Sequence, residues 1–297
     1  MATWTRTWPF HLMVWPALLF LIVFNYVPMA GIVMAFMDYK PWLGFTGSPW
    51  IGLDHFRALF ERDDSIQVIW NTLVISVLKI VFNLIVPFTF AILLNEVRKR
   101  LLNRTIQTLV YLPHFLSWVI LGGILVNFLS TDGGFANRVL GFFGLGPVFF
   151  LGDGNWFRVT VVVSEVWKEF GYGTIVFIAA LANINPSLYE AAEVDGASRW
   201  KQTLHITIPS LLPMAIVVGT LSLGNILNAG FDQIFNLYNS LVYDKGDIID
   251  TFVYRTAIID GDFGFATAVG LFNSVISMLL IIVAYRLAYK LANYRVF

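Results

Sequence analysis

The chain has 297 residues, of which 58% are hydrophobic, 16% are aromatic and only 13% are charged. A typical soluble domain has roughly 25% charged residues, so this composition indicates a membrane protein. The sequence contains no cysteine, which excludes disulfide bonds, thiolate metal sites and a cysteine nucleophile. The formal net charge is zero, and among partners we expect membrane lipid and no nucleic acid.

Six runs are long and apolar enough to cross a bilayer, for which a helix needs about 20 mainly apolar residues. The first run is too long for a removable signal and no cleavage site follows it, so we expect it to be retained. We therefore predict an all-α polytopic membrane protein with six transmembrane helices in a single domain, residues 1–297. The predicted spans are Phe10–Phe36, Ile69–Leu94, Thr105–Leu129, Phe157–Leu181, Leu211–Leu227 and Phe265–Ala288.

The distribution of lysine and arginine predicts that both termini lie in the cytoplasm, because cytoplasmic loops carry an excess of these residues. The N-terminus, the loops after the second and fourth spans and the C-terminal tail carry ten basic and four acidic residues. The opposite side carries eight basic and fifteen acidic residues. The outer segments are long, and one of them, GGFANRVLGFFGLG, predicts either a short amphipathic helix or a plain connector.

Most enzyme chemistries find no support in this sequence. The four histidines are scattered one per region and form no HExxH or comparable metal-ligand spacing. No GxxxxGK[ST] loop is present to cradle nucleotide phosphates, so any ATP must be used by a partner. No serine sits in a nucleophile elbow, and the Asp-Phe-Gly triplet at 262–264 lacks the other kinase motifs. A polytopic membrane enzyme is the alternative interpretation, but the sequence offers no paired intramembrane carboxylates to support it.

Polar residues within apolar spans are candidates for a translocation path, since an ionisable group in lipid must be paired or face water. Lys79 either lines such a path or pairs with a neighbouring helix. Glu165, Lys168 and Glu169 share neighbouring helix positions, where a local ion pair explains them as well as substrate contact. The stretch GNILNAGFDQ predicts either an unwound segment beside a water-filled cavity or a simple helix end. The candidate path residues are Lys79, Trp118, Trp167, Tyr172, Asn225, Asn228, Asp232 and Asn273.

A polar segment, residues 183–210, separates the fourth and fifth spans. Asn185, followed by proline, is a typical helix start, and Gly196 suits the left-handed conformation that ends a helix. Asp195 or Ser198 can cap a second short helix through RWKQTLHIT. We predict a cytoplasmic helix-turn-helix shaped to sit in a groove of another protein, with a plain amphipathic linker as the alternative.

The order Glu-Ala-Ala, three residues, Gly, nine residues, Ile-Thr-Ile-Pro within this segment resembles the EAA signature of the membrane-spanning subunits of binding-protein-dependent ABC importers. Only Ile208 departs from it, where the family usually has leucine. The similarity extends over nearly the whole chain, through stretches such as QTLVYLPHFLSW, AGFDQIFNLYN and ATAVGLFNSVISM. These resemble the carbohydrate-uptake branch, close to oligosaccharide and polysaccharide permeases of the aldouronate and alginate type.

The resemblance implies an ABC importer permease fold in a bacterial inner membrane. An extracytoplasmic solute-binding protein would deliver sugar, uronate polymers such as alginate included, to a cavity between this subunit and a second homologous permease. Two partner subunits would bind ATP and Mg and engage the polar segment, so this chain is expected to hold no cofactor. Import of another solute class, such as amino acids or metal ions, is the alternative. The coupling residues implied are Glu190, Ala191, Ala192, Asp195, Gly196, Arg199, Ile206 and Pro209.

Overall fold

The computed structural model describes residues 2–292, and the side chains of residues 8 and 10–286. The side chains of Arg6, Lys290 and Arg295, which contribute to the charge asymmetry, lie outside that set. Within the described chain the regular elements are helices, and an isolated bridge joins Met37 to Trp50. The predicted all-α class is therefore confirmed.

The number of membrane-crossing segments agrees with the prediction when bent helices are counted together. Four helices are long and apolar enough to span a membrane alone, and two pairs of helices, bent by 100° and 67°, are long and apolar enough only when the two helices of each pair are taken together. Each bent pair counted as one span gives six. The segments are Phe10–Phe36, Asp63–Asn95, Arg100–Phe115 with Trp118–Leu129, Gly154–Ala182 with Pro186–Val194, Arg199–Leu223 and Phe263–Arg286.

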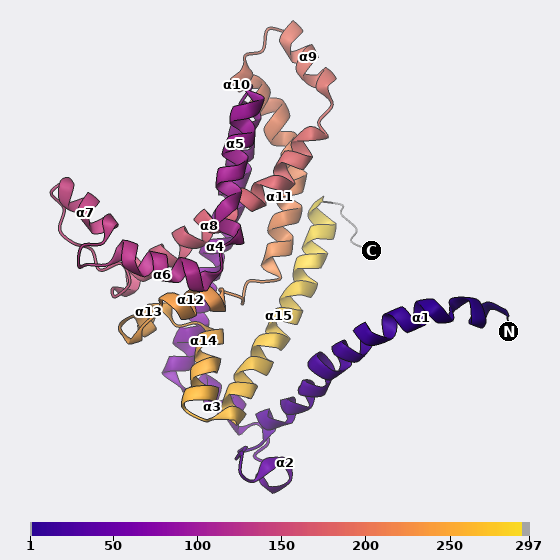
Figure 1. Cartoon of the computed structure of the whole chain (residues 1–297), viewed down its shortest axis with the longest axis vertical. Coiled ribbons are helices and arrows are strands. Elements are labelled where there is room, and N and C mark those ends of the chain that lie inside the picture. The colour runs from indigo at the N-terminus through magenta and orange to yellow at the C-terminus, as the bar shows by residue number, and fades with distance from the viewer. Residues whose placement is uncertain (1, 293–297) are drawn as a thin grey trace. The chain divides into compact units, whose positions relative to one another are not determined.

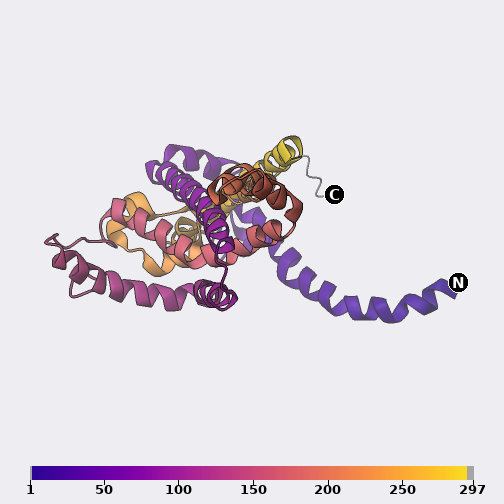
Figure 2. The same ribbon diagram turned by 90° about the horizontal axis from the view of Figure 1, so that it is seen from above.

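The chain divides into two compact units. Unit 1 contains residues 1–62 and 253–272. Its first helix continues through a wide turn and a tighter helical stretch as one curved run, coloured indigo in Figures 1 and 2. Its elements are α1 (Ala2–Leu21), the turns Ile22–Tyr26 and Val27–Phe36, α2 (Gly44–Gly47), α3 (Asp54–Glu61), the turn Arg255–Ile259 and the first third of α15 (Phe263–Ala292).

Three chain segments of unit 1 meet closely around Met37, His55 and Gly264. The His55 ring contacts the Met37 carbonyl oxygen through Nε2, at 3.0 Å. A Cβ at Gly264 would lie 2.4 Å from that ring nitrogen and 2.6 Å from the same carbonyl oxygen. Glycine is therefore required where α15 begins, and the Asp-Phe-Gly triplet has a packing explanation rather than a catalytic one.

Unit 2 contains residues 63–252 and the chain from Asn273 onward. Its longest helices, α4 and α8, pack side by side (Figure 1). Gly173 of α8 allows this packing, because a Cβ there would lie 3.2 Å from the Pro87 side chain of α4, and small residues let membrane helices approach closely. The elements are α4 (Asp63–Asn95), α5 (Arg100–Tyr111), the turn Leu112–Phe115, α6 (Trp118–Leu129), α7 (Phe135–Phe142), α8 (Gly154–Ala182), α9 (Pro186–Val194), α10 (Arg199–Gln202), the turn Thr203–Thr207, α11 (Ile208–Leu223), α12 (Phe231–Leu237), the turn Ser240–Val242, α13 (Tyr243–Gly246) and most of α14 (Ile249–Tyr254).

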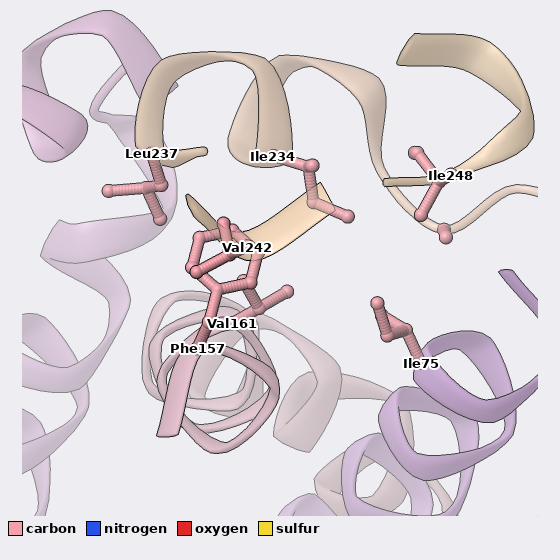
Figure 3. Packing of buried hydrophobic residues seen from close by; sticks show 8 residues of the cluster. Ile75, Phe157, Val161, Ile234, Leu237, Val242 and Ile248 are labelled. Carbon is pink, nitrogen blue, oxygen red and sulfur yellow. The ribbon is translucent and has the colours of Figure 1, made fainter. Parts of the chain in front are cut away.

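One apolar cluster fixes the short helices after α11 against the long pair. Phe157 and Val161 of α8 and Ile75 of α4 are fully buried in it (Figure 3). Ile234 and Leu237 project into it from α12. The cluster therefore helps to position the non-helical stretch, residues 224–230, that precedes α12.

Two predicted spans differ from the observed elements. The third is not one helix, because Pro113 lies in a tight turn and Leu116 is extended, after which the Ser117 hydroxyl accepts a hydrogen bond from the Ile120 amide at 3.4 Å. The fifth was predicted to start at Leu211, after a separate short helix. Instead, Arg199–Leu223 is one continuous helical segment.

The helix crosses Pro209 because the turn before it is wider than an α-turn. The Ile208 amide donates to the Thr203 carbonyl oxygen, five residues back, and such a π-turn accommodates a local irregularity in a helix. The short helix expected in GGFANRVLGFFGLG is confirmed as α7.

We expect Gly171→Ala to destabilise the protein, because the added Cβ would lie 2.1 Å from the Val110 carbonyl oxygen of α5. Overpacking of this kind costs about 1–3 kcal/mol. Gly123→Ala is the control, since no atom lies within 4 Å of its Cβ position and alanine favours a helix by up to about 1 kcal/mol. Thermal unfolding of the purified variants measures both, and equal midpoints would contradict the close α5–α8 packing.

Candidate functional site

A buried lysine holds the centre of the candidate site. Lys79 of α4 is only 6% exposed, and its Nζ donates to the Ala229 carbonyl oxygen at 2.6 Å and to Gln233 Oε1 of α12. Glu165 Oε2 of α8 lies 3.8 Å from the same Nζ. Lys79 therefore pairs with neighbouring elements, one of the two predicted roles, and connects three parts of unit 2.

Gln233 extends this network without adding charge. Its side-chain nitrogen donates to the Val161 carbonyl oxygen at 2.7 Å and to Ser164 Oγ at 2.8 Å. The Ser164 hydroxyl donates onward to the Thr160 carbonyl oxygen at 2.6 Å. Every polar group of this fully buried amide has a partner, as a low-dielectric interior requires.

The helix break predicted in GNILNAGFDQ is confirmed. Helix α11 ends at Leu223, and the chain does not become helical again until Phe231. Gly230 has φ of +91°, and a Cβ there would lie 3.0 Å from Lys79 Nζ. Both facts require glycine. The Ala229 carbonyl oxygen freed by the break is an acceptor for Lys79. The break therefore supplies an acceptor to the buried ammonium group, and the ammonium group supplies a donor to the freed carbonyl oxygen.

Two polar cavities lie beside the break and share Asn225 and Asn228 in their walls. The larger has a volume of about 300 Å³ and the smaller about 240 Å³. The larger is lined by Ser76, Lys79, Ile80, Asn83, Glu165, Ser222, Asn225, Asn228, Ala229 and Gly230. The smaller is lined by Gly224, Asn225, Leu227, Asn228, Asp250, Asn273, Ser277 and Ile281.

The structure brings half of the predicted path residues together. Lys79, Asn225, Asn228 and Asn273 line these two cavities. Asp232 does not, because it is exposed in the first turn of α12. The sequence did not lead us to Ser76, Asn83, Ser277 or Asp250. Ser76 and Asn83 were predictable, because with Lys79 they place a polar residue in successive turns of an apolar helix.

The aromatic candidates belong to other surroundings. Trp167 lines an apolar cavity between α4 and α8. The Tyr172 ring stacks on His114 with centroids 4.1 Å apart, and Lys168 Nζ lies 5.7 Å from the Trp118 ring centroid. Tyr172 and Trp118 therefore lie at the bend between α5 and α6, and none of the three aromatic residues is among those that line the two polar cavities.

A charged cluster fastens that bend to α8. His114 Nδ1 lies 2.7 Å from Glu169 Oε2. Lys168 Nζ lies 2.7 Å from Glu169 Oε1 and donates to the His114 carbonyl oxygen at 3.0 Å. The local ion pair predicted in this span therefore joins Lys168 to Glu169, whereas Glu165 faces Lys79 on another helix.

The polar segment forms the predicted first helix and turn. Asn185 Oδ1 accepts from the Ser187 amide at 3.1 Å at the start of α9. Gly196 has φ of +71°, and the Ala197 amide donates to the Ala192 carbonyl oxygen at 2.8 Å, which closes the helix end. Of the two predicted caps, Ser198 is the one used, at 3.5 Å from the Lys201 amide.

Two side-chain contacts hold this segment against the spans. Arg199 Nη1 lies 3.1 Å from Glu96 Oε2 at the end of α4, and the Tyr189 hydroxyl lies 2.9 Å from Thr207 Oγ1. Glu190 and Ala191 of the signature, by contrast, are exposed. The remaining signature residues are Ala192, half-buried, Asp195, exposed, and Ile206 and Pro209, which lie within the continuous fifth span.

Within the described residues, no group of three or more metal-ligating side chains is placed to hold a metal ion. The site consists instead of a neutralised ion pair, amide and hydroxyl groups beside a helix break, and a separate exposed polar segment. Such an arrangement can bind and release a polar solute.

Comparison with known proteins defines the family. Residues 83–294 match the family described as the binding-protein-dependent transport system inner membrane component. The chain belongs to this family and is an ABC importer permease rather than an enzyme. Permeases of this kind work with ATP-binding subunits, a second permease and an extracytoplasmic binding protein.

Relatives at high identity match nearly the full chain. Protein LplB of Bacillus subtilis (strain 168) is 42% identical over 280 residues, covering 94% of this chain and 88% of LplB. The polygalacturonan/rhamnogalacturonan transport system permease YteP of the same organism is 41% identical, covering 94% and 87%. A chain of a bacterial ABC transporter involved in alginate import is 38% identical with a TM-score of 0.87, covering 98% of both chains.

We expect Lys79→Met to destabilise the permease by about 1–3 kcal/mol, because it leaves the half-buried Glu165 without its cation and the Ala229 and Gln233 oxygens without their donor. Combining it with Glu165→Gln should recover part of that loss, since no uncompensated charge then remains, although the Ala229 and Gln233 oxygens still lack their donor. Unfolding of the single and double variants measures this coupling. Lys40→Met is the control, since its ion pair with Asp38 is exposed and worth at most about 1 kcal/mol. Additive effects of the two buried substitutions would contradict the pairing.

Proposed function

We propose that this chain is one of two permease subunits that pass an oligosaccharide or polysaccharide from an extracytoplasmic binding protein into the cytoplasm. The observation that carries the proposal is the polar double cavity beside a membrane helix break, in a chain whose nearly full-length relatives carry sugar-import names. The related alginate importer is known in complex with a periplasmic protein that holds an alginate pentasaccharide. Import of amino acids or metal ions is the competing outcome.

The proposed path runs along the two cavities. Lys79, Asn225, Asn228 and Asn273 line it. Pockets that hold small molecules have volumes of about 300–1,000 Å³. The larger cavity, at about 300 Å³, reaches the lower end of that range and the smaller, at about 240 Å³, lies below it, so we expect the path to hold sugar rings one at a time. Amide and hydroxyl groups bind sugar hydroxyls without the strong attachment that would prevent release.

The polar segment around α9 is the proposed contact with the ATP-binding partners. Those partners would bind ATP and Mg, and one such segment per chain requires two permeases for two ATPases. Glu190 and Ala191 are exposed for docking, while Arg199 and Glu96 hold the segment against the spans. A partner that contacts the segment differently with and without ATP shifts the permease between its two accessible states.

We further propose that both termini are cytoplasmic, as the charge distribution predicts. The chain has no native cysteine, so single cysteines report topology directly. A membrane-impermeant maleimide added to intact cells should label Asp132→Cys, an exposed position after α6, and should label Lys99→Cys, an exposed position between α4 and α5, only after permeabilisation. The reverse pattern would overturn the orientation.

The function is tested with the complete importer in vesicles. We expect wild-type chain to copurify with an ATP-binding subunit and a second permease, and to support ATP-dependent uptake of an oligosaccharide. Glu190→Ala should lower uptake about tenfold, as loss of about 1.4 kcal/mol of contact does. Gly196→Pro should do the same, because proline cannot adopt φ of +71°.

The matched control is Asp132→Ala, an exposed carboxylate outside the segment. Unchanged uptake in both segment variants would identify the segment as a plain linker. Uptake of an amino acid or metal ion in place of sugar would overturn the substrate class while leaving the coupling intact.

A further inference from the structure

The charged cluster at the bend between α5 and α6 has a composition that suits a ligand as well as a fastening. It consists of His114 of the bend with Lys168 and Glu169 of α8. Glu169 Oε1 lies 2.7 Å from Lys168 Nζ, and Glu169 Oε2 lies 2.7 Å from His114 Nδ1. One carboxylate therefore uses both of its oxygens to hold two groups that can carry positive charge.

This cluster is accessible, unlike the network around Lys79. The side chains of Glu169 and His114 are 28% and 27% exposed, whereas Gln233 in the other network is fully buried. Lys168 is itself buried. A molecule outside the chain can therefore meet the carboxylate and the imidazole directly, and it can meet the ammonium group once the Glu169 side chain moves away.

The donors of the cluster remain in place without Glu169. Lys168 Nζ also donates to the His114 carbonyl oxygen at 3.0 Å, so this ammonium group stays fixed to the bend when its carboxylate partner leaves. His114 Nδ1 donates to Glu169, because an ionised carboxylate only accepts. The two donors thus present a fixed position for a carboxylate, and Glu169 is one occupant of that position.

Two aromatic rings adjoin the same donors. The half-exposed Tyr172 ring stacks on His114 with centroids 4.1 Å apart, and the Trp118 ring centroid lies 5.7 Å from Lys168 Nζ. Aromatic faces pack against the apolar faces of sugar rings. A sugar ring that carries a carboxylate matches both the donors and the rings.

We propose that this cluster is a subsite for a uronate unit, whose carboxylate replaces that of Glu169 on Lys168 and His114. The inference rests on the proposed sugar import, and it specifies the acidic class of sugar and the residues that recognise its charge. Tyr172 and Trp118 position the sugar ring beside the two donors.

Exchange of one carboxylate for another explains how a charged solute is bound and still released. A buried cation without a partner is strongly destabilising, and Lys168 avoids this state because either Glu169 or the uronate compensates it. One ion pair breaks as the other forms, so the solute gains only the difference between them. Recognition by charge then does not require attachment too strong for transport.

The test measures equilibrium binding of sugars to the assembled importer without its binding protein. The probes are a labelled oligogalacturonate and a neutral galacto-oligosaccharide of equal length. We expect wild type to bind the uronate more tightly. Lys168→Met should weaken uronate binding about tenfold, the effect of about 1.4 kcal/mol, and leave binding of the neutral sugar unchanged. Lys168→Arg should retain most uronate binding, because a guanidinium donates to a carboxylate through two N–H groups.

Glu169→Gln separates exchange from a purely structural role. Without the competing carboxylate, uronate binding should tighten, and uronate uptake by importer in ATP-loaded proteoliposomes should slow because release becomes harder. The thermal midpoint of this variant should fall, since Lys168 loses its counter-ion. The uronate should then raise that midpoint more than it raises the midpoint of wild type. A cluster that only fastens the bend would lose stability without this selective response.

The matched control is Lys245→Met, because Lys245 donates to Asn155 away from the cluster. Its binding of both sugars should equal that of wild type. The subsite is overturned if wild type binds the uronate no better than the neutral sugar, or if Lys168→Met leaves uronate binding unchanged. If the importer hydrolyses ATP but takes up neither sugar, the proposed sugar import fails instead.

Discussion

The buried charge of Lys79 is the constraint on which unit 2 depends. A lysine in an apolar span must have acceptors within reach, and here they come from a carboxylate on α8, an amide on α12 and a carbonyl oxygen released by a helix break. The break is possible only because Gly230 leaves room for the ammonium group. The charge of Lys79 and the apolar cluster around Phe157 together fix α12 against α4 and α8.

The same arrangement separates charge compensation from solute recognition. Lys79 and Glu165 neutralise one another, and Gln233 completes their hydrogen bonding. The rest of the polar groups in the cavity walls are amides, hydroxyls and one carboxylate, Asp250. A permease gains from this division, because a solute held by hydroxyl contacts leaves more easily than one held by an ion pair.

Much of this structure follows from the sequence, where local chemistry decides the outcome. The span count, the helix end at Gly196, the Asn185 cap and the break after Leu223 are predictable because glycine, asparagine and proline act locally. The bend at Leu116 and the continuous helix through Pro209 are not, because packing against α8 and a wide turn outweigh local preference. Two partners of Lys79 lie 150 and 154 residues away in sequence and the third, Glu165, lies on another helix, so no local pattern could identify them.

The unbroken helix from Arg199 to Leu223 gives the proposed coupling a mechanical form. At about 1.5 Å per residue, its 25 residues form a helix about 37 Å long that can transmit a displacement along its axis. One end is in the polar segment, and the other carries Asn225 and Asn228 just beyond it in the cavity walls. Because a helix turns about 100° per residue, a single inserted residue would rotate the cavity end relative to the docking end. The number of residues in this helix therefore constrains the coupling as closely as the side chains do.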